Sequence, residues 1–160
     1  MSKLDLVVKK LYRKPKIKKF GGLDHPVRSN QEGFFMLWLK KNRVDYYYLK
    51  NEYIKNKKHE GVYIPPCKIP DSKILIEYRS QVSKKEIEKL IHFKKIFSEH
   101  KLGLVVTKER QRVKIPKECY DKLLILEENY YHLDYENPIL QDFLAWIENS
   151  KLEQESQIPL

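Results

Sequence analysis

The chain has 160 residues, 41% of them hydrophobic and 12% aromatic, which is enough apolar material for one domain with a core and argues against general disorder. No run approaches the ~20 apolar residues of a membrane-spanning helix, and the opening MSKLDLVVKK lacks the apolar region of a signal peptide. Cys67 and Cys119 are too few for a disulfide framework or a zinc cluster. We therefore expect a cytoplasmic protein with two free thiols and no membrane contact.

Positive charge is concentrated in the first three quarters of the chain. Residues 1–120 hold 30 Lys and Arg against 13 Asp and Glu, a net charge of +17, whereas residues 121–160 carry −7. So basic a body attracts polyanions, of which nucleic acid is the commonest. A lysine-rich composition without such a partner is the plain alternative. Three interpretations of the acidic C-terminal region are open: it shields the basic face, contacts a protein partner or is simply solvated.

The first half of the chain predicts a basic arm, a loop, a helix and two strands. Residues 1–20 are expected to form an N-terminal arm or an edge strand, and the Gly, Asp and Pro of GGLDHPVRSN indicate a loop. A helix is predicted from Asn30 to about Lys41, because Ser29 and Glu32 fit a capping box. Its apolar face consists of Phe34, Phe35, Trp38 and Leu39. The aromatic segment 45–50 predicts a first strand, and GVYIPP predicts a second that stops at the two prolines.

The third predicted strand, Lys73–Arg79, carries charge on one of its faces. Its side chains alternate, so Ile74, Ile76 and Tyr78 point one way while Leu75, Glu77 and Arg79 point the other way. A half-exposed strand with a cross-strand ion pair would explain a carboxylate beside a cation. So would a strand that brings both groups to a metal and phosphate site.

The second half predicts a helix, two strands and a last helix. Ser83 and Glu86 form a capping box for a helix whose inner stripe is Ile87, Leu90, Ile91, Lys94 and Phe97. The apolar run 102–107 is typical of a buried parallel strand, and 122–126 predicts a fifth strand. Asn137 and Pro138 begin a helix that is expected to end near Asn149, followed by a flexible tail over 151–160.

These elements predict an α/β fold, a single mixed-sheet sandwich with an αβββαβ core and a C-terminal β-α. The order resembles the restriction-endonuclease-like fold of the PD-(D/E)xK nuclease superfamily. The segments SNQEGFFMLWLKKNRVDYYYLKN, HEGVYI, KILIEYRS and GLVVT are similar to the nuclease-like module at the C-terminus of archaeal P-loop ATPases. The resemblance implies one nuclease-like domain over residues 21–150.

The resemblance also implies a site for catalysis and metal binding. The active site of that superfamily takes an acid from the second strand and an acid-x-lysine pair from the third, together with a glutamate from the first helix. The matching catalytic candidates are Glu77, Arg79, Glu60, Asp71 and Glu32. Glu77, Glu60 and Asp71 are the candidate ligands of Mg²⁺, which prefers oxygen ligands and would activate water beside a phosphodiester.

Two departures from the family pattern bear on activity. Arg79 stands where a lysine is expected, and an arginine binds phosphate but stays protonated and cannot act as a base. Gly61 stands where the second strand would carry an aspartate. Three interpretations remain open: a metal-dependent DNA endonuclease, a catalytically inactive nuclease-like domain that binds nucleic acid or a protein, and an unrelated basic adaptor.

The expected nucleic-acid contacts are lysines, with DNA as the favoured partner. They are Lys14, Lys16, Lys18, Lys19, Lys55, Lys57, Lys58, Lys84 and Lys85. The tyrosines at 46–48 could stack on unpaired bases, although a tyrosine-rich strand is more often packed in a sheet. A homodimer and a protein partner on the acidic C-terminal region are further expectations.

Overall fold

The computed structural model describes residues 21–48, 63–107, 113–126 and 137–157. The predicted N-terminal arm therefore lies outside the described residues. Within them, five strands form one mixed sheet and three α-helices pack around it, so the predicted α/β class is confirmed. No helix among these residues is long and apolar enough to cross a membrane.

The sheet follows the chain order without interruption, β1-β2-β3-β4-β5. Its strands are β1 (Tyr47–Tyr48), β2 (Cys67–Lys68), β3 (Ile74–Arg79), β4 (Lys101–Thr107) and β5 (Lys122–Leu126). Strands β1, β2 and β3 pair antiparallel as a meander, while β3, β4 and β5 pair in parallel. β3 is the central strand of the five, and the pairing changes from antiparallel to parallel at this strand.

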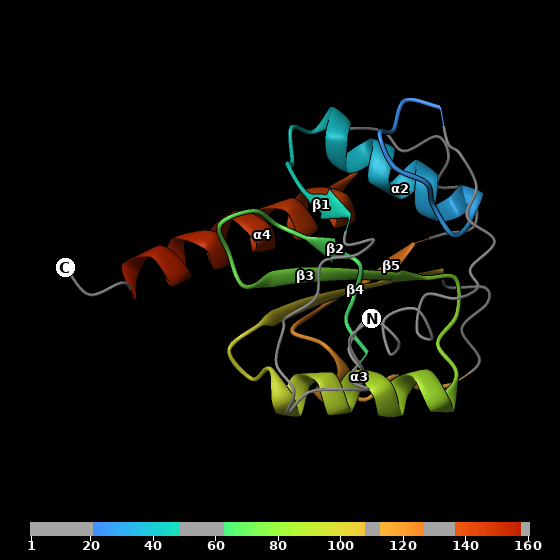
Figure 1. Ribbon diagram of the computed structural model, residues 1–160, viewed down its shortest axis with the longest axis vertical. Coiled ribbons are helices and arrows are strands. Elements are labelled where there is room, and N and C mark those ends of the chain that lie inside the picture. Colours follow the sequence, from blue (N-terminus) through green and yellow to red (C-terminus); the bar gives the residue numbers. More distant parts are fainter. Residues whose placement is uncertain (1–20, 49–62, 108–112, 127–136, 158–160) are drawn as a thin grey trace, which may run out of the picture.

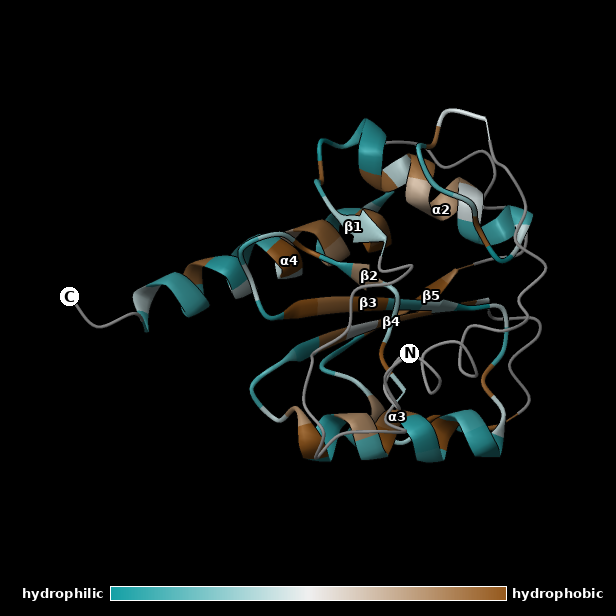
Figure 2. Ribbon diagram, in the orientation of Figure 1, coloured by the Kyte–Doolittle hydropathy of each residue, from teal (hydrophilic) through white to brown (hydrophobic). Residues whose placement is uncertain are grey.

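Helices cover both faces of the sheet, and each face has its own core (Figure 1). Helices α2 (Asn30–Lys41) and α4 (Pro138–Ser156) lie on one face, and α3 (Lys84–Ile96) lies on the other. The predicted alternation along β3 is confirmed, because Ile74, Ile76 and Tyr78 join the α2 and α4 core whereas Leu75 joins the α3 core. In Figure 2, β3 is mainly apolar, while α3 alternates apolar and polar residues as a helix with one buried face should.

Local sequence signals place the helix starts accurately. Helix α2 has the predicted bounds, and Ser83 and Glu86 form the expected capping box of α3. Helix α4 begins after Asn137 as predicted but continues to Ser156, so its predicted end near Asn149 was wrong and residues 151–156 are helical. Its last turns are tied to the sheet, because the Gln154 side chain accepts from the Lys73 backbone N–H at 2.8 Å and Glu153 pairs with Lys101. These tertiary contacts extend the helix past the point where its apolar pattern fades.

The second strand was predicted one step too early. The prediction ended this strand at Pro65-Pro66, but β2 begins after both prolines, at Cys67. Cys67 pairs with Ile76, and the Ile69 N–H donates to the Ile74 carbonyl at 3.0 Å. The prolines therefore mark the beginning of the ladder and not its end, and Tyr63 and Ile64 precede it outside any strand.

Gly103 lets α4 approach the sheet closely. A Cβ placed on Gly103 would lie 2.9 Å from ring atoms of both Phe143 and Trp146 on α4. Real carbon contacts are longer than this, so a side chain at this point of β4 would force the helix or its aromatic rings to move. The absence of a side chain at position 103 therefore determines how tightly this layer closes.

We predict that Gly103→Ala lowers the free energy of unfolding by about 1–3 kcal/mol, the usual cost of overpacking a core. Gly21→Ala is the matched control, since a Cβ there meets nothing within 4 Å. Urea denaturation of both variants measures the difference. Equal stabilities for the two variants would show that α4 does not depend on this close approach.

Candidate functional site

Two carboxylates are buried at one end of the sheet although they come from different layers. Glu32 lies in the first turn of α2 and is 1% exposed, and Glu77 lies on β3 and is 0% exposed. Burial of an ionised carboxylate is costly unless charges and hydrogen bonds compensate it. The surroundings of these two residues therefore have to supply positive charge and donors.

Arg28 joins the two carboxylates. Its Nε donates to Oε2 of Glu32 at 2.7 Å, and its Nη2 donates to Oε1 of Glu77 at 2.7 Å. Its Nη1 donates to the Tyr63 hydroxyl at 3.3 Å. Burial alone would lower the pKa of Arg28, but Glu77, Tyr63 and Glu32 raise it well above its ordinary value. One guanidinium thus uses all three of its nitrogens to connect the layer of α2 with the α3 side of β3.

Two tyrosines complete the carboxylate coordination. The Tyr48 hydroxyl donates to Oε1 of Glu32, and the Tyr63 hydroxyl donates to Oε2 of Glu77. Burial, with the adjacent carboxylates adding to it, raises the pKa of both phenols above their ordinary range, so both keep the proton that they donate. As a result all four oxygens of Glu32 and Glu77 accept from protein donors.

The proline pair makes room for Arg28 at the edge of β3. The β2–β3 register pairs Cys67 with Ile76, and the Ile69 N–H donates to the Ile74 carbonyl. Continuing the same register would place Pro65 opposite Tyr78. Pro65 has no N–H to donate there. Instead Nη2 of Arg28 donates to the Tyr78 carbonyl at 3.0 Å. The guanidinium therefore occupies the edge of β3 where β2 stops.

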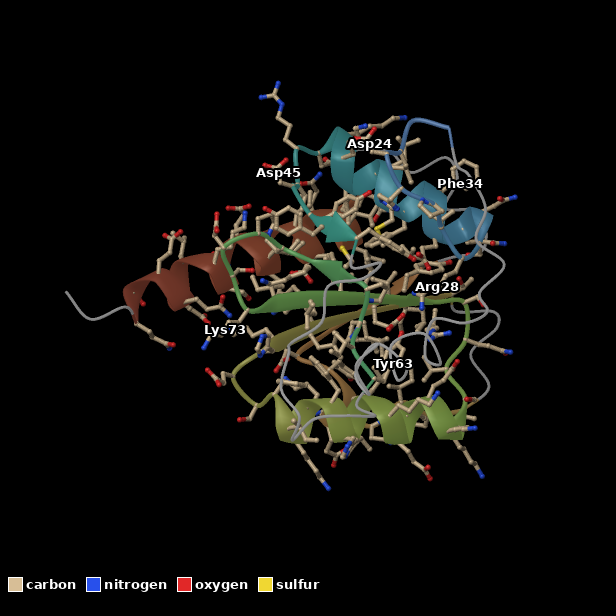
Figure 3. The ribbon with its side chains drawn as sticks, in the orientation of Figure 1. Asp24, Arg28, Phe34, Asp45, Tyr63 and Lys73 are labelled. Carbon is tan, nitrogen blue, oxygen red and sulfur yellow. The ribbon has the colours of Figure 1, made fainter. Side chains whose placement is uncertain are left out.

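A partly exposed rim continues the cluster toward α3. Nε of Arg79 lies 3.3 Å from Oε1 of Glu77, and Nη1 lies 3.4 Å from Oε1 of Glu86. Arg79 also donates to the Tyr63 hydroxyl at 3.0 Å, and its guanidinium lies over the Tyr63 ring. These three residues and Glu77 line a shallow hollow with Lys89 and Leu90 of α3. In Figure 3, Tyr63 lies between β3 and α3 with Arg28 near it.

The structure brings together three of the predicted site residues. Glu32, Glu77 and Arg79 share the cluster around Arg28. The Glu32 backbone N–H donates to the Ser29 side chain as a cap requires, while its carboxylate is bound by Arg28 and Tyr48. The interpretation of Glu32 as a plain capping residue therefore misses the role of its side chain.

The other candidates are not part of this cluster as far as the structure describes them. Asp71 is exposed in the turn before β3, with a φ of 53°, at the opposite end of the strand from Glu77. Figure 3 shows that end by the label of Lys73. Glu60 lies outside the described residues, as do the lysines at 14, 16, 18, 19, 55, 57 and 58. Lys84 and Lys85 are exposed in the first turn of α3, directly before Glu86.

Sequence reasoning missed the residues that organise the site, namely Arg28, Tyr48 and Tyr63. Arg28 precedes Glu32 by four positions, the spacing of a helical ion pair, and this was the available signal. Tyr48 is one of the tyrosines predicted to be able to stack on bases, and in the structure its hydroxyl donates to Glu32. No sequence pattern predicts the contact of the Tyr63 hydroxyl with Glu77, because that contact depends on where the chain enters β2.

We predict that Tyr63→Phe lowers the free energy of unfolding by about 1–3 kcal/mol, because it removes the donor to a buried carboxylate oxygen. Tyr47→Phe is the matched control, since Tyr47 is 55% exposed, and it should change stability by less than about 0.5 kcal/mol. Thermal and urea denaturation measure both effects. A loss no larger than that of the control would contradict a donor role for the Tyr63 hydroxyl.

The same hydroxyl predicts a response to alkali. The pKa of Tyr63 is raised in the folded state, while tyrosines of an unfolded chain ionise near pH 10. Stability from this group is thus complete below about pH 10 and is lost as the pH rises above it. Wild type should lose stability more steeply than Tyr63→Phe in this range, as followed by urea denaturation at several pH values. Parallel pH curves would contradict the burial of an un-ionised phenol.

The chain was compared with known proteins by family, by sequence and by structure. No family model, no curated protein and no solved structure matches it.

Proposed function

We propose that this chain is a nucleic-acid-binding protein with a restriction-endonuclease-like fold whose acidic site is occupied by arginine. Its partner is proposed to be DNA, bound through phosphates without metal-dependent cleavage. The observation that carries the proposal is the meeting of Glu32, Glu77 and Arg79 around the guanidinium of Arg28.

The order of elements supports the fold part of the proposal. The resemblance implies a glutamate-bearing helix, a three-stranded meander, a crossover helix and a further parallel strand. Helix α2, strands β1 to β3, helix α3 and strand β4 follow in that order, and the sheet keeps the chain order. The helix glutamate and the acid-x-cation pair of β3 come from the elements that the resemblance implies, and they lie in contact through Arg28.

The coordination of the carboxylates favours a binding protein over a nuclease. A divalent metal would need free carboxylate oxygens, but those of Glu32 and Glu77 all accept from Arg28, Tyr48 or Tyr63. Within the described ranges no group of three His, Cys, Asp or Glu could hold a metal ion. Arg79 adds a second positive charge beside Glu77. As they are placed, these residues do not fit the Mg²⁺ that the resemblance implies.

Charge supports nucleic acid as the ligand. The net charge of the chain is +10, and the basic excess lies in residues 1–120. Near the cluster, Lys84 and Lys85 are exposed at the start of α3, and Lys89 lies one turn further on the rim of the hollow. Lysines that neutralise phosphates release counterions, so the affinity should fall steeply with salt.

We predict that the full chain binds duplex and branched DNA in EDTA, without any requirement for Mg²⁺, and leaves the DNA intact when Mg²⁺ is present. Lys84→Glu/Lys85→Glu should weaken binding at least tenfold and reduce the slope of log affinity against log salt. Fluorescence anisotropy measures the affinity, and gel electrophoresis of the same mixtures detects cleavage.

The matched control reverses two charges at the far end of α2. Lys41→Glu/Arg43→Glu changes the net charge equally, but both residues are exposed at the C-terminal end of α2, the end opposite Arg28. It should weaken binding much less than the α3 pair. Equal losses of affinity in the two variants would mean that net charge alone drives the binding. Metal-dependent cutting that is lost in Glu77→Ala would make the protein a nuclease. Failure to bind DNA at all would favour a protein partner.

A further inference from the structure

We infer that Arg28 is a built-in cation that takes the place of a divalent metal ion between Glu32 and Glu77. The inference concerns the chemistry of the cluster alone and stands whether or not the chain binds nucleic acid. It predicts that wild type does not need or take up a metal here, and that a chain without Arg28 does.

The position of the Arg28 guanidinium is that of a bridging cation. It lies between two carboxylates that arrive from separate layers, one from α2 and one from β3, with both contacts at 2.7 Å. Carboxylates brought together from different elements repel each other unless a cation lies between them. A divalent metal ion neutralises neighbouring carboxylates by binding their oxygens, and here the Arg28 side chain neutralises them.

The positive charge near the two carboxylates matches that of a divalent metal ion. Glu32 and Glu77 are buried and together require two positive charges for neutrality. Arg28 lies against both of them, and Arg79 lies 3.3 Å from Glu77. The two guanidiniums therefore supply the charge of one divalent cation, although only Arg28 reaches both carboxylates.

The guanidinium nitrogens of Arg28 also fit the acceptors around them. The three nitrogens of Arg28 reach Glu32, Glu77, the Tyr63 hydroxyl and the Tyr78 carbonyl. The last two contacts hold the guanidinium beside β3, at the point of the β2–β3 register where Pro65 has no N–H to donate. A planar fork of this kind satisfies divergent acceptors in a way that the single ammonium of a lysine does not. Arg28 is 17% exposed on its side chain, so the bridge is largely removed from water.

The test removes the built-in cation and offers Mn²⁺ in its place. Arg28→Met leaves two buried carboxylates facing each other without the cation between them, and the shorter, uncharged side chain leaves space. We predict that Mn²⁺ raises the melting temperature of Arg28→Met by about 5–10 °C at roughly 100 times its Kd, or folds the variant if it is unfolded without metal. Circular dichroism follows folding, and electron paramagnetic resonance counts bound Mn²⁺ without any nucleic acid present.

Three further chains, namely Arg28→Met/Glu77→Gln, wild type and Glu77→Gln, make the result decisive. Arg28→Met/Glu77→Gln should lose the Mn²⁺ effect, because one carboxylate of the pair is gone. Wild type should show no bound Mn²⁺ that depends on Glu77. The inference is overturned if Mn²⁺ neither stabilises nor folds Arg28→Met, or if wild type binds Mn²⁺ and Glu77→Gln abolishes that binding.

Discussion

The bridge from Arg28 to Glu32 and Glu77 is the interaction on which the arrangement of this end of the molecule depends. It connects a residue at the start of α2 with the charged side of β3, so the helix layer and the sheet are fixed to each other by charge as well as by apolar packing. A buried bridge of this kind adds little net stability over an apolar core, but its partial removal is severe because it leaves charge unpaired. Its value is therefore in specifying one arrangement of α2 against β3.

Several ordinary features of the chain make this bridge possible. Ser29 caps α2 and so places Glu32 in its first turn, and the alternation of β3 puts Glu77 on the side away from the α2 core. Pro65 has no N–H to donate to β3, and the Tyr78 carbonyl accepts from the Arg28 guanidinium. At the far end of the sheet, the close approach of α4 at Gly103 and its ties to Lys73 and Lys101 hold the helix that completes the same core.

Local patterns predicted much of the fold, and contacts between distant segments explain what they missed. Ser29, Ser83 and Asn137 located three helix starts, and the alternation of β3 was read correctly. The end of α4 and the start of β2 were misjudged, because one depends on contacts with the sheet and the other on the role of a proline pair within the ladder. Glu77 and Arg79 were expected to share a face, which the structure confirms. The cation that joins Glu77 to Glu32, Arg28, is 49 positions from Glu77, and no local rule joins two residues so far apart.

The most direct measurement is a stability cycle in which Glu32→Gln and Glu77→Gln are made in wild type and in Arg28→Met. If Arg28 is the cation that makes both carboxylates tolerable, each carboxamide should cost stability in wild type, by about 3–5 kcal/mol if the guanidinium is left unpaired. In the Arg28→Met background the same changes should stabilise the chain, because they remove buried charges that no longer have their shared partner. Equal costs in both backgrounds would contradict the bridge as the organising interaction of the site.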